Sequence, residues 1–318
     1  MYEKIFQGNI NVHEGDYMDI KARILELKKE KNAVILAHYY VPDEVQEIAD
    51  YIGDSFYLSK IATGVEADVI VFCGVSFMGE SAKILNPNKL VIMPDATADC
   101  AMAHMATVDR IKKVREEYED VAVVCYINSI AELKVHSDVC VTSANAVKIV
   151  QALPNKNIYF IPDVNLAKHV SDKVPDKHFI FNEGFCPIHH KLTKEEVLRA
   201  KELHPDAEFL VHPECQSDVL VYADYVGSTS GIIDYATASD CKEFVIGTEE
   251  GVLYELRKKN PNKNFYVVSD HMICQDMKKI TLDKIQKSLE NMENQVEVNE
   301  KVREGANHSL NRMLELGK

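Results

Sequence analysis

Three cysteines are spaced almost evenly along the 318-residue chain and could bind a metal centre together. Cys100, Cys186 and Cys274 are 86 and 88 residues apart, and each follows an apolar segment. Structural zinc usually has four ligands, often from two local CxxC pairs, and this chain has no CxxC. An iron–sulfur cluster accepts widely separated cysteines, and three ligands on a four-iron cluster leave one iron open to a substrate. Such an iron would act as a Lewis acid, which suits dehydration chemistry.

The remaining cysteines do not recur at this spacing, and we expect them to be structural. A free cysteine in an apolar strand is usually a small buried hydrophobic residue. This group comprises Cys73, Cys125, Cys140, Cys215 and Cys241.

Two further polar positions repeat together with the three cysteines. Apolar segments end near His38, Tyr126 and His212, which are 88 and 86 residues apart, and a small hydroxyl residue follows each of them by 17 positions. These hydroxyl residues are Ser55, Ser143 and Thr229, and each stands at an expected helix start. Backbone N–H groups at a helix start bind anions, whereas a hydroxyl there is also an ordinary cap of the helix. The two roles can coexist, so the repeat predicts three equivalent sets of donors for an anionic ligand.

The repeat of about 87 residues predicts three similar units of alternating strands and helices. Each unit has a first strand (Ala33–Tyr40, Val121–Asn128, Phe209–Glu214), a second (Asp68–Cys73, Asn157–Pro162, Glu243–Gly247) and a third (Leu90–Pro94, His178–Asn182, Asn264–Ser269). Strands alternating with helices predict parallel sheets, and nearly continuous apolar strands predict sheets covered on both faces. We therefore expect an α/β protein of three three-layer α/β/α domains related by a pseudo-threefold axis. Ligands of parallel sheets gather at the carboxyl ends of the strands, which places the site on that axis.

The same period sets the expected domain boundaries. The three repeats are predicted over 32–118, 119–206 and 207–280. Residues 1–31 and 281–318 lie outside the repeat, as an N-terminal segment and a polar, helical C-terminal tail.

Composition and charge exclude several classes of protein. The chain has 50 acidic and 36 basic residues, giving a net charge of −14, and this balance argues against binding to nucleic-acid backbones. Its 46% hydrophobic and 27% charged residues are typical of globular domains rather than of disordered or disulfide-rich chains. No window approaches a membrane span, and the first residues lack the features of a signal peptide. We expect a cytoplasmic protein that acts on small molecules, without nucleic-acid or membrane partners.

Several segments together resemble the quinolinate synthase family over nearly the whole chain. They are AHYYVPDEVQEIADYIGDS (37–55), VIVFCGVSFMGESAKILNP (69–87), CAMAHM (100–105), CYINSIAELKVHSDVCVTSANA (125–146), GFCPIHH (184–190), HPECQSDVLVYADYVGSTSGI (212–232) and CQDMKKITL (274–282). The resemblance implies three α/β/α domains and a [4Fe-4S] cluster with one open iron, held by Cys100, Cys186 and Cys274. Some relatives carry a CxxCxxC segment near the C-terminus, where this chain has the single Cys274, followed by Gln275-Asp276 where Pro-Asn is expected.

The resemblance also implies a reaction and its partners. Iminosuccinate and dihydroxyacetone phosphate would condense to quinolinate, phosphate and water in the de novo biosynthesis of NAD. Functional coupling to the enzyme that produces iminosuccinate is a further expectation.

The site residues follow from the same resemblance. Side chains expected to bind the carboxylates and the phosphate are those of His38, Ser55, Tyr126, Asn128, Ser143, His212, Glu214 and Thr229, and Ile127 and Pro213 would contribute backbone contacts. Tyr40, His38 and Glu214 are the candidates for the proton transfers, which require a group within hydrogen-bonding reach of the reacting atoms. For His189, a donor role toward cluster or substrate and a packing role both stay open.

Two other functions are compatible with a three-cysteine cluster. One is electron transfer or oxygen sensing, although an electron carrier would need neither an open iron nor polar strand ends repeated three times. The other is a simple hydro-lyase acting on a hydroxy acid. Release of phosphate separates the two, because the condensation must release it and a hydro-lyase need not.

Overall fold

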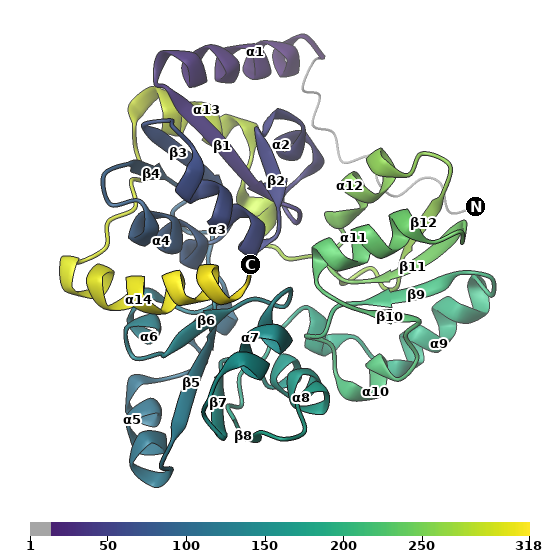
Figure 1. Ribbon diagram of the computed structural model, residues 1–318. Coiled ribbons are helices and arrows are strands. Elements are labelled where there is room, and N and C mark those ends of the chain that lie inside the picture. The colour runs from purple at the N-terminus through teal and green to yellow at the C-terminus, as the bar shows by residue number, and fades with distance from the viewer. Residues whose placement is uncertain (1–13) are drawn as a thin grey trace.

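Three parallel sheets make up the framework of the protein. The computed structural model describes residues 14–318, and within them each sheet has four strands in the same spatial order: β2-β1-β3-β4, β6-β5-β7-β8 and β10-β9-β11-β12. Figure 1 shows the three groups of strands and helices arranged around a common centre. The predicted α/β fold with three parallel repeats is therefore confirmed. Residues 1–13, part of the predicted N-terminal segment, lie outside the described residues.

The three units are named here in chain order, and their elements are as follows. The first unit contains β1 (Ala33–His38), α2 (Asp43–Ile48), β2 (Tyr51–Gly53), α3 (Ser55–Gly64), β3 (Val69–Cys73), α4 (Ser76–Leu85), β4 (Leu90–Ile92), η1 (Ala101–His104) and α5 (Val108–Glu117). The second contains β5 (Val121–Tyr126), α6 (Ala131–Val135), β6 (Val139–Val141), α7 (Ala146–Ala152), β7 (Asn157–Ile161), α8 (Val164–Lys173), β8 (His178–Phe181), η2 (His189–Lys191) and α9 (Lys194–Leu203). The third contains β9 (Glu208–Val211), α10 (Ser217–Leu220), β10 (Tyr225–Val226), α11 (Thr229–Ala238), β11 (Glu243–Gly247), α12 (Val252–Lys259), β12 (Asn264–Val267) and η3 (Met277–Lys279).

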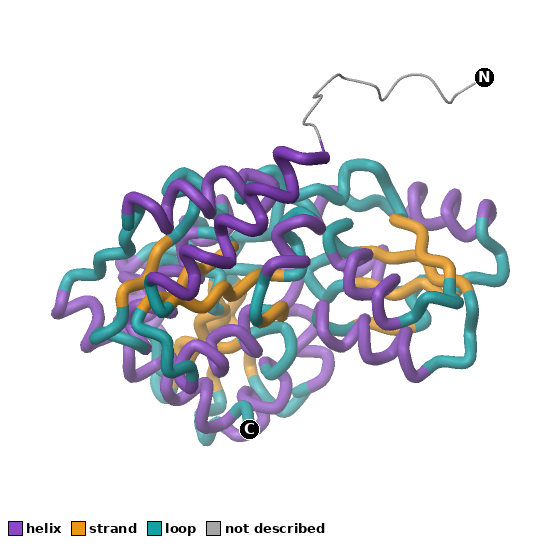
Figure 2. The backbone as a smooth tube through the Cα atoms, turned by 90° about the horizontal axis from the view of Figure 1, so that it is seen from above, coloured by secondary structure: helices purple, strands orange, loops and turns teal. Residues whose placement is uncertain are grey.

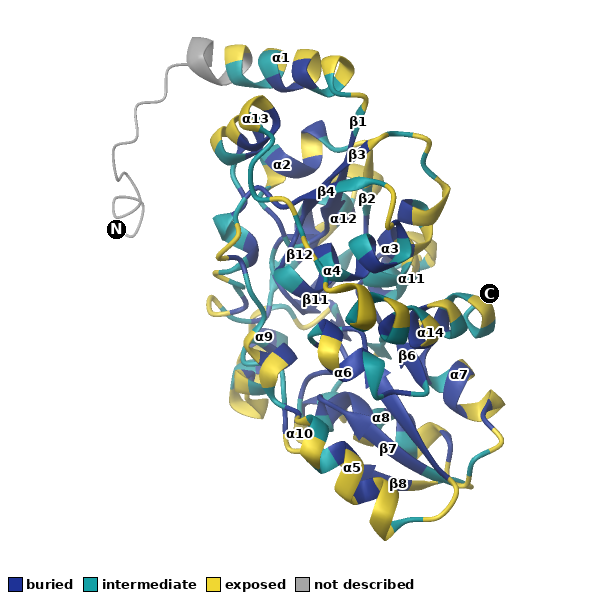
Figure 3. Cartoon of the chain, turned by 90° about the vertical axis from the view of Figure 1, so that its left-hand side faces the viewer, coloured by how far each residue is buried: buried dark blue, intermediate teal, exposed yellow. Residues whose placement is uncertain are grey.

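The central strands are buried on both faces, as their apolar sequences require. Every residue of β3 and of β5 is buried, and Figure 2 shows the strands inside a surround of helices. Burial of each apolar side chain contributes about 1.5–3 kcal/mol, so these strands form the centre of each unit. Figure 3 shows the complementary pattern on the helices, whose exposed residues face outward.

One strand in each unit was missed by the sequence prediction, which gave three strands rather than four. The missed strands are β2, β6 and β10, only two or three residues long, and each pairs with the carboxyl end of the first strand of its unit. So short a segment carries no hydrophobic periodicity that could reveal it.

The C-terminal tail is helical, as predicted, and packs back on the first two units. Helix α13 (Leu282–Asn291) lies against α1 (Glu14–Glu30), and α14 (Glu300–Leu316) lies against α4, α6 and β6. Gly305 permits the close approach to α6, because a Cβ there would come within 2.7 Å of the Val135 side chain. The tail thus joins the first unit to the second.

The apolar interior is divided unevenly among the units. Within residues 14–318, one continuous core spans the first and second units together with α13 and α14, whereas the third unit has two smaller apolar clusters. No helix of this part of the chain is long and apolar enough to cross a membrane.

Candidate active site

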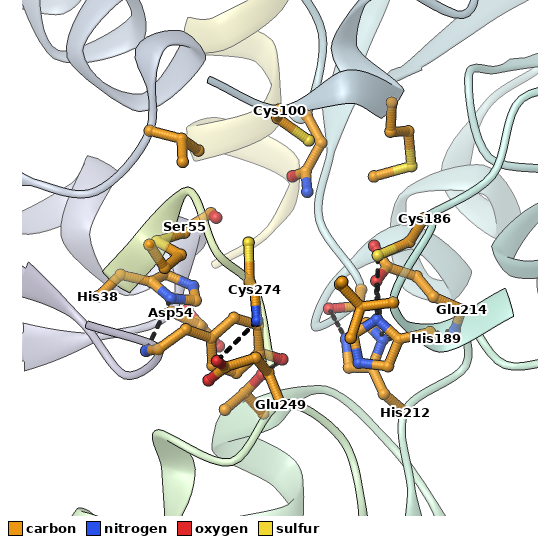
Figure 4. A pocket seen from close by; sticks show the side chains of 18 of the residues that line it. His38, Asp54, Ser55, Cys100, Cys186, His189, His212, Glu214, Glu249 and Cys274 are labelled. Atoms are coloured by element: carbon orange, nitrogen blue, oxygen red, sulfur yellow. Dashed lines mark hydrogen bonds and ion pairs between the residues drawn. The ribbon is translucent and has the colours of Figure 1, made fainter. Parts of the chain in front are cut away.

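A pocket lies where strand ends of all three units meet. Figure 4 shows side chains from the three units pointing into it. The residues predicted from sequence that line it are His38, Tyr40, Ser55, Cys100, Tyr126, Asn128, Ser143, Cys186, His212, Glu214, Thr229 and Cys274. Ile127 and Pro213 are buried at the same strand ends but are not among the lining residues, and their contacts stay predictions.

The three symmetric cysteines reach the pocket through the same local structure. Each precedes a short 3-10 turn, η1, η2 or η3, by one to three residues. The cysteine carbonyl accepts a backbone N–H of that turn, from Ala103, His190 or Lys278, at 2.9–3.2 Å. Desolvation raises the pKa of Cys100 to about 12 and also raises the pKa values of Cys186 and Cys274. Without a metal these groups are thiols, and a metal would be needed to displace their protons.

This donor set fits an iron–sulfur cluster. Three cysteines outside any disulfide come from three different units, and their thiols face one pocket (Figure 4). Cysteine thiolates are the usual ligands of iron–sulfur clusters. Cys186, His189 and Glu214 additionally have ligand atoms within 4.8 Å of one another, so this side of the pocket could also hold a metal ion.

The non-equivalent cysteines lie elsewhere. Cys73, Cys125, Cys140 and Cys215 are buried, Cys241 is partly exposed, and none of the five lines the pocket. Burial raises the pKa of Cys73, which packs in the core as an apolar residue would.

Glu214 is the central carboxylate of the pocket and is only 3% exposed. Its Oε2 lies 2.7 Å from His189 Nδ1 and 3.5 Å from His212 Nδ1. Burial acts to raise the pKa of Glu214, but the imidazoles of His212 and His189 outweigh it and hold that pKa at about 2. The side chain is therefore a carboxylate at neutral pH and can accept a proton.

The two histidines at the strand ends are neutral, and their tautomers follow from their neighbours. Burial lowers the pKa values of His38 and His212 to about 3. The backbone N–H of Tyr40 donates to His38 Nδ1 at 3.2 Å, and that of Glu214 donates to His212 Nδ1 at 3.3 Å. In each ring the proton is thus on Nε2. His212 Nε2 lies 3.1 Å from Ser143 Oγ.

A chain of hydrogen bonds connects Tyr40 with Glu214. The Tyr40 hydroxyl lies 2.7 Å from Thr229 Oγ1 and 2.8 Å from Thr248 Oγ1, and Thr248 Oγ1 lies 2.9 Å from His189 Nε2. Because an ionised Glu214 can only accept, His189 donates from Nδ1 and accepts at Nε2, which makes Thr248 a donor and Tyr40 the donor to Thr248. Burial raises the pKa of Tyr40, so its hydroxyl keeps the proton that this arrangement requires.

The hydroxyl residues at the helix starts are not the caps of those helices. Ser55 and Thr229 are the first residues of α3 and α11, and the capping side chains are those of Asp54 and Ser228. The prediction for Ser143 was wrong in detail: it lies in a turn, and α7 begins only at Ala146, because the Asn145 carboxamide accepts the N–H of Thr142 and extends the turn. The hydroxyls of Ser55 and Thr229 are free of a capping role.

Several buried polar atoms at the pocket have no partner within the described residues. They include Glu214 Oε1, Asn128 Oδ1 and Thr142 Oγ1, all on residues that line the pocket. Buried polar groups in native proteins are normally hydrogen-bonded, so these atoms are suited to contact a ligand.

Sequence reasoning did not identify all of the acidic and polar groups around the pocket. It missed Asp54, Asp99 and Glu249, which line it, and Asp163 and Thr248 beside it. Asp163 lies two residues beyond β7, Glu249 lies two residues beyond β11, and the two are 86 residues apart, like Cys100 and Cys186. This spacing could have identified both acids from the sequence.

Comparison with known proteins gives a consistent result. The model of a family described as Quinolinate synthetase A protein matches residues 22–315. A quinolinate synthase of Clostridioides difficile (strain 630) is 52% identical over 298 residues, covering 94% of this chain and 98% of the relative. One from Caldicellulosiruptor saccharolyticus is 53% identical over 301 residues, with 95% and 99% coverage. One from Fusobacterium nucleatum subsp. nucleatum is 52% identical over 297 residues, with 93% and 99% coverage.

Proposed function

The chain belongs to the Quinolinate synthetase A protein family, and we propose that its pocket condenses iminosuccinate with dihydroxyacetone phosphate to give quinolinate, phosphate and water. Its activity is that of a quinolinate synthase in NAD biosynthesis. The observation that carries the proposed chemistry is the single pocket in which three thiols, one from each unit, face a buried carboxylate and neutral donors. Coupling to the enzyme that produces iminosuccinate and location in the cytoplasm stay predictions.

We propose that Cys100, Cys186 and Cys274 hold a [4Fe-4S] cluster with one open iron. When bound, this group would supply a Lewis-acidic iron that can polarise a substrate oxygen or nitrogen. The support comes from the donor set, because the three thiols share the pocket and each cysteine stands beside a turn whose backbone N–H bonds its carbonyl.

The chain's own residues are proposed to bind both anionic substrates by neutral donors. None of the pocket-lining residues within 14–318 is a lysine or an arginine. The Nε2–H of His38 and the hydroxyls of Ser55, Ser143 and Tyr126 are the available donors, because His212 Nε2–H already donates to Ser143 and Thr229 to Tyr40. Burial keeps the Tyr126 hydroxyl protonated by raising its pKa. Water is largely excluded by the burial of these groups, so each hydrogen bond to a carboxylate or phosphate is strengthened.

Proton transfers are proposed to use the two ends of the hydrogen-bonded chain. Glu214 is ionised and has a free Oε1, so it is the group suited to take a proton from a substrate carbon or nitrogen. Tyr40 is protonated and can donate one. His189 and Thr248 lie at hydrogen-bonding distance between the two groups, and return of a proton from Glu214 to Tyr40 requires each bond of this chain to reverse its donor.

One anaerobic experiment tests this function. The protein is reconstituted with iron and sulfide, iron per chain is measured, and iminosuccinate and dihydroxyacetone phosphate are then supplied. We expect about four irons per chain together with quinolinate and phosphate in equal amounts. Iron without either product would indicate a redox or sensor protein, dehydration without phosphate release would indicate a hydro-lyase, and absence of iron would overturn the assignment of the three cysteines.

A further inference from the structure

Two of the three ligand cysteines donate their backbone N–H to a buried acidic side chain. Cys186 N lies 3.0 Å from Asp163 Oδ2, and Cys274 N lies 3.0 Å from Glu249 Oε1. In the first unit the acidic neighbour of Cys100 is Asp99, whose carboxylate bonds the hydroxyl of Ser76 and the imidazole of His104. Figure 4 shows the contact between Cys274 and Glu249 at the edge of the pocket.

Asp163 and Glu249 occupy equivalent places in their units. Asp163 lies two residues beyond β7 and Glu249 two residues beyond β11, and they are 0% and 1% exposed. In all three units a backbone N–H just beyond the strand donates to the carbonyl of the residue two positions before the cysteine. The pairs are Ser76 to Ala98, Val164 to Gly184 and Glu250 to Met272, at 2.8–2.9 Å. The acid and this backbone bond together join the cysteine loop to the carboxyl end of the strand.

The first unit departs from this pattern in an informative way. The position equivalent to Asp163 and Glu249 is Val75, which has no acceptor. Asp99 supplies the carboxylate from the cysteine loop itself, and the hydroxyl of Ser76 and the imidazole of His104 hold it in place. The first unit therefore also has a carboxylate in its cysteine loop, and it bonds Ser76, the residue that follows Val75.

We propose that Asp99, Asp163 and Glu249 are positioning residues, each fixing the loop of one cysteine so that its Sγ faces the pocket. Asp163 and Glu249 take up the N–H of their cysteine, and the cysteine carbonyl accepts an N–H of the following turn, that of His190 or Lys278. The thiols are thereby oriented in a protein without iron. This inference rests on the proposed cluster site, and groups around metal ligands commonly change metal affinity by about 10- to 100-fold.

Both oxygens of the two buried acids are in use, which makes amide variants informative. Asp163 Oδ1 accepts the N–H of Leu166 at 2.7 Å, and Glu249 Oε2 accepts that of Gly251 at 2.7 Å. In Asp163→Asn or Glu249→Gln the new NH₂ group must face one of two N–H donors. The cysteine loop or the neighbouring turn then loses its anchor, while the side chain keeps its volume.

The test measures how firmly iron is held, independently of catalysis. Asp99→Asn, Asp163→Asn and Glu249→Gln are reconstituted anaerobically, and iron release to a ferrous chelator is timed for each. We expect release at least about tenfold faster than in the wild type. The matched control is Asp138→Asn, whose carboxylate likewise accepts a backbone N–H, that of Val123 at 2.7 Å, but far from the cysteines. It should release iron at the wild-type rate, and urea unfolding of the iron-free proteins compares their stabilities.

The outcomes separate this proposal from the cluster itself. Asp99 has a side chain that is 45% exposed, so Asp99→Asn is expected to fold even if a buried variant does not. Wild-type protein that holds iron while the three variants release it at the wild-type rate would overturn the positioning role alone. The positioning role would also be overturned if Asp138→Asn released iron as fast as Asp99→Asn, Asp163→Asn and Glu249→Gln. Wild-type protein that takes up no iron would overturn the cluster proposal, and this one with it.

Discussion

Thr248 is the residue whose hydroxyl joins the two proposed acid–base groups. Replacing it in Thr248→Val keeps the shape but leaves Tyr40 and His189 without their common partner. We expect kcat to fall at least about tenfold with iron content unchanged, because positioned proton transfer commonly contributes about 10²–10⁴ in rate. Quinolinate formation at saturating substrates measures the effect.

The controls for this substitution are also available in the chain. Thr248→Ser should restore most of the rate, since it returns the hydroxyl. Thr237→Val removes a hydroxyl that bonds within α11, outside the pocket, and should leave kcat unchanged. Equal rates for Thr248→Val and the wild type would exclude the connection as a proton path.

The cysteines give the sharpest contrast between residues of one type. Cys100→Ala, Cys186→Ala and Cys274→Ala should each abolish stable iron binding and activity, because each removes one of three protein ligands. Cys73→Ala should retain both, since Cys73 is buried in the core and does not line the pocket. Iron analysis after anaerobic gel filtration decides between them, and full iron in any of the first three would remove that cysteine from the ligand set.

Buried neutral histidines make the protein sensitive to acid. The pKa values of His38 and His212 are lowered to about 3 in the folded protein, against 6.5 for the ordinary residue. Between these values the unfolded chain binds more protons, so stability is present above pH 6.5 and falls as the pH drops below it. Each histidine contributes a slope of up to about 1.4 kcal/mol per pH unit.

Urea unfolding of the iron-free protein between pH 5 and 7 tests this slope. The carboxylate of Glu214 is not a contributor in that range, because its pKa is lowered from 4.5 to about 2 and its share is lost only at lower pH. His212→Asn should reduce the slope by the share of one histidine. An unchanged slope would mean that His212 is protonated in the folded protein.

At the scale of elements, one type of lysine hydrogen bond recurs at the amino-terminal edge of every sheet. A lysine ammonium donates to backbone carbonyls at or just after the end of α3, α7 or α11. Lys89 bonds Ala67 O, Lys177 bonds Leu153 O and Asn155 O, and Lys263 bonds Ala236 O and Ser239 O, at 2.6–2.9 Å. The lysines are 88 and 86 residues apart. These hydrogen bonds hold the C-terminal end of each helix against its sheet.

Removing one of these lysines should destabilise its unit. Lys263→Met loses two charge-assisted bonds while keeping the aliphatic stem, and we expect about 2 kcal/mol lower free energy of unfolding. Lys113→Met, which removes only an exposed pair with Glu117 on α5, should cost well under about 1 kcal/mol. Equal urea midpoints for the two variants would show that the hydrogen bonds of Lys263 do not stabilise the third unit.

The elements also show what sequence could and could not predict. The nine longer strands were predicted because buried parallel strands are continuous apolar runs, and the cysteines and strand-end residues because the period aligned them. The edge strands β2, β6 and β10 are too short to carry a pattern, and Ser143 was misplaced because Asn145 delays the start of α7. The hydrogen bonds of Thr248 depend on neighbours about 60 to 210 residues away in sequence, which no local spacing encodes.

At the scale of the whole molecule, the third unit is attached differently from the other two. The first and second share one apolar core, whereas the third joins them through two smaller apolar clusters, which include Tyr39 of the first unit and Val197 of the second, and through polar contacts. Buried Gln46 is the clearest, with its Nε2 at 2.9–3.0 Å from Tyr39 O, Val41 O and Gly251 O. Lys278 adds a bond to Tyr40 O at 2.9 Å.

Loss of Gln46 should loosen this attachment first. In Gln46→Ala the carbonyl of Gly251 loses its partner in the first unit, and we expect faster hydrogen–deuterium exchange over residues 248–259. Exchange over residues 157–173 of the second unit should not change. Uniform protection in both segments would show that other contacts suffice to hold the third unit.

The distribution of the cysteines over three units also has a consequence for synthesis of the chain. Cys274 belongs to the last unit to be translated, and α13 and α14, which follow it, pack on the first and second units. A growing chain on the ribosome therefore cannot bring the three thiols together until the third unit has emerged. Iron loading by the arrangement proposed here therefore has to await the third unit.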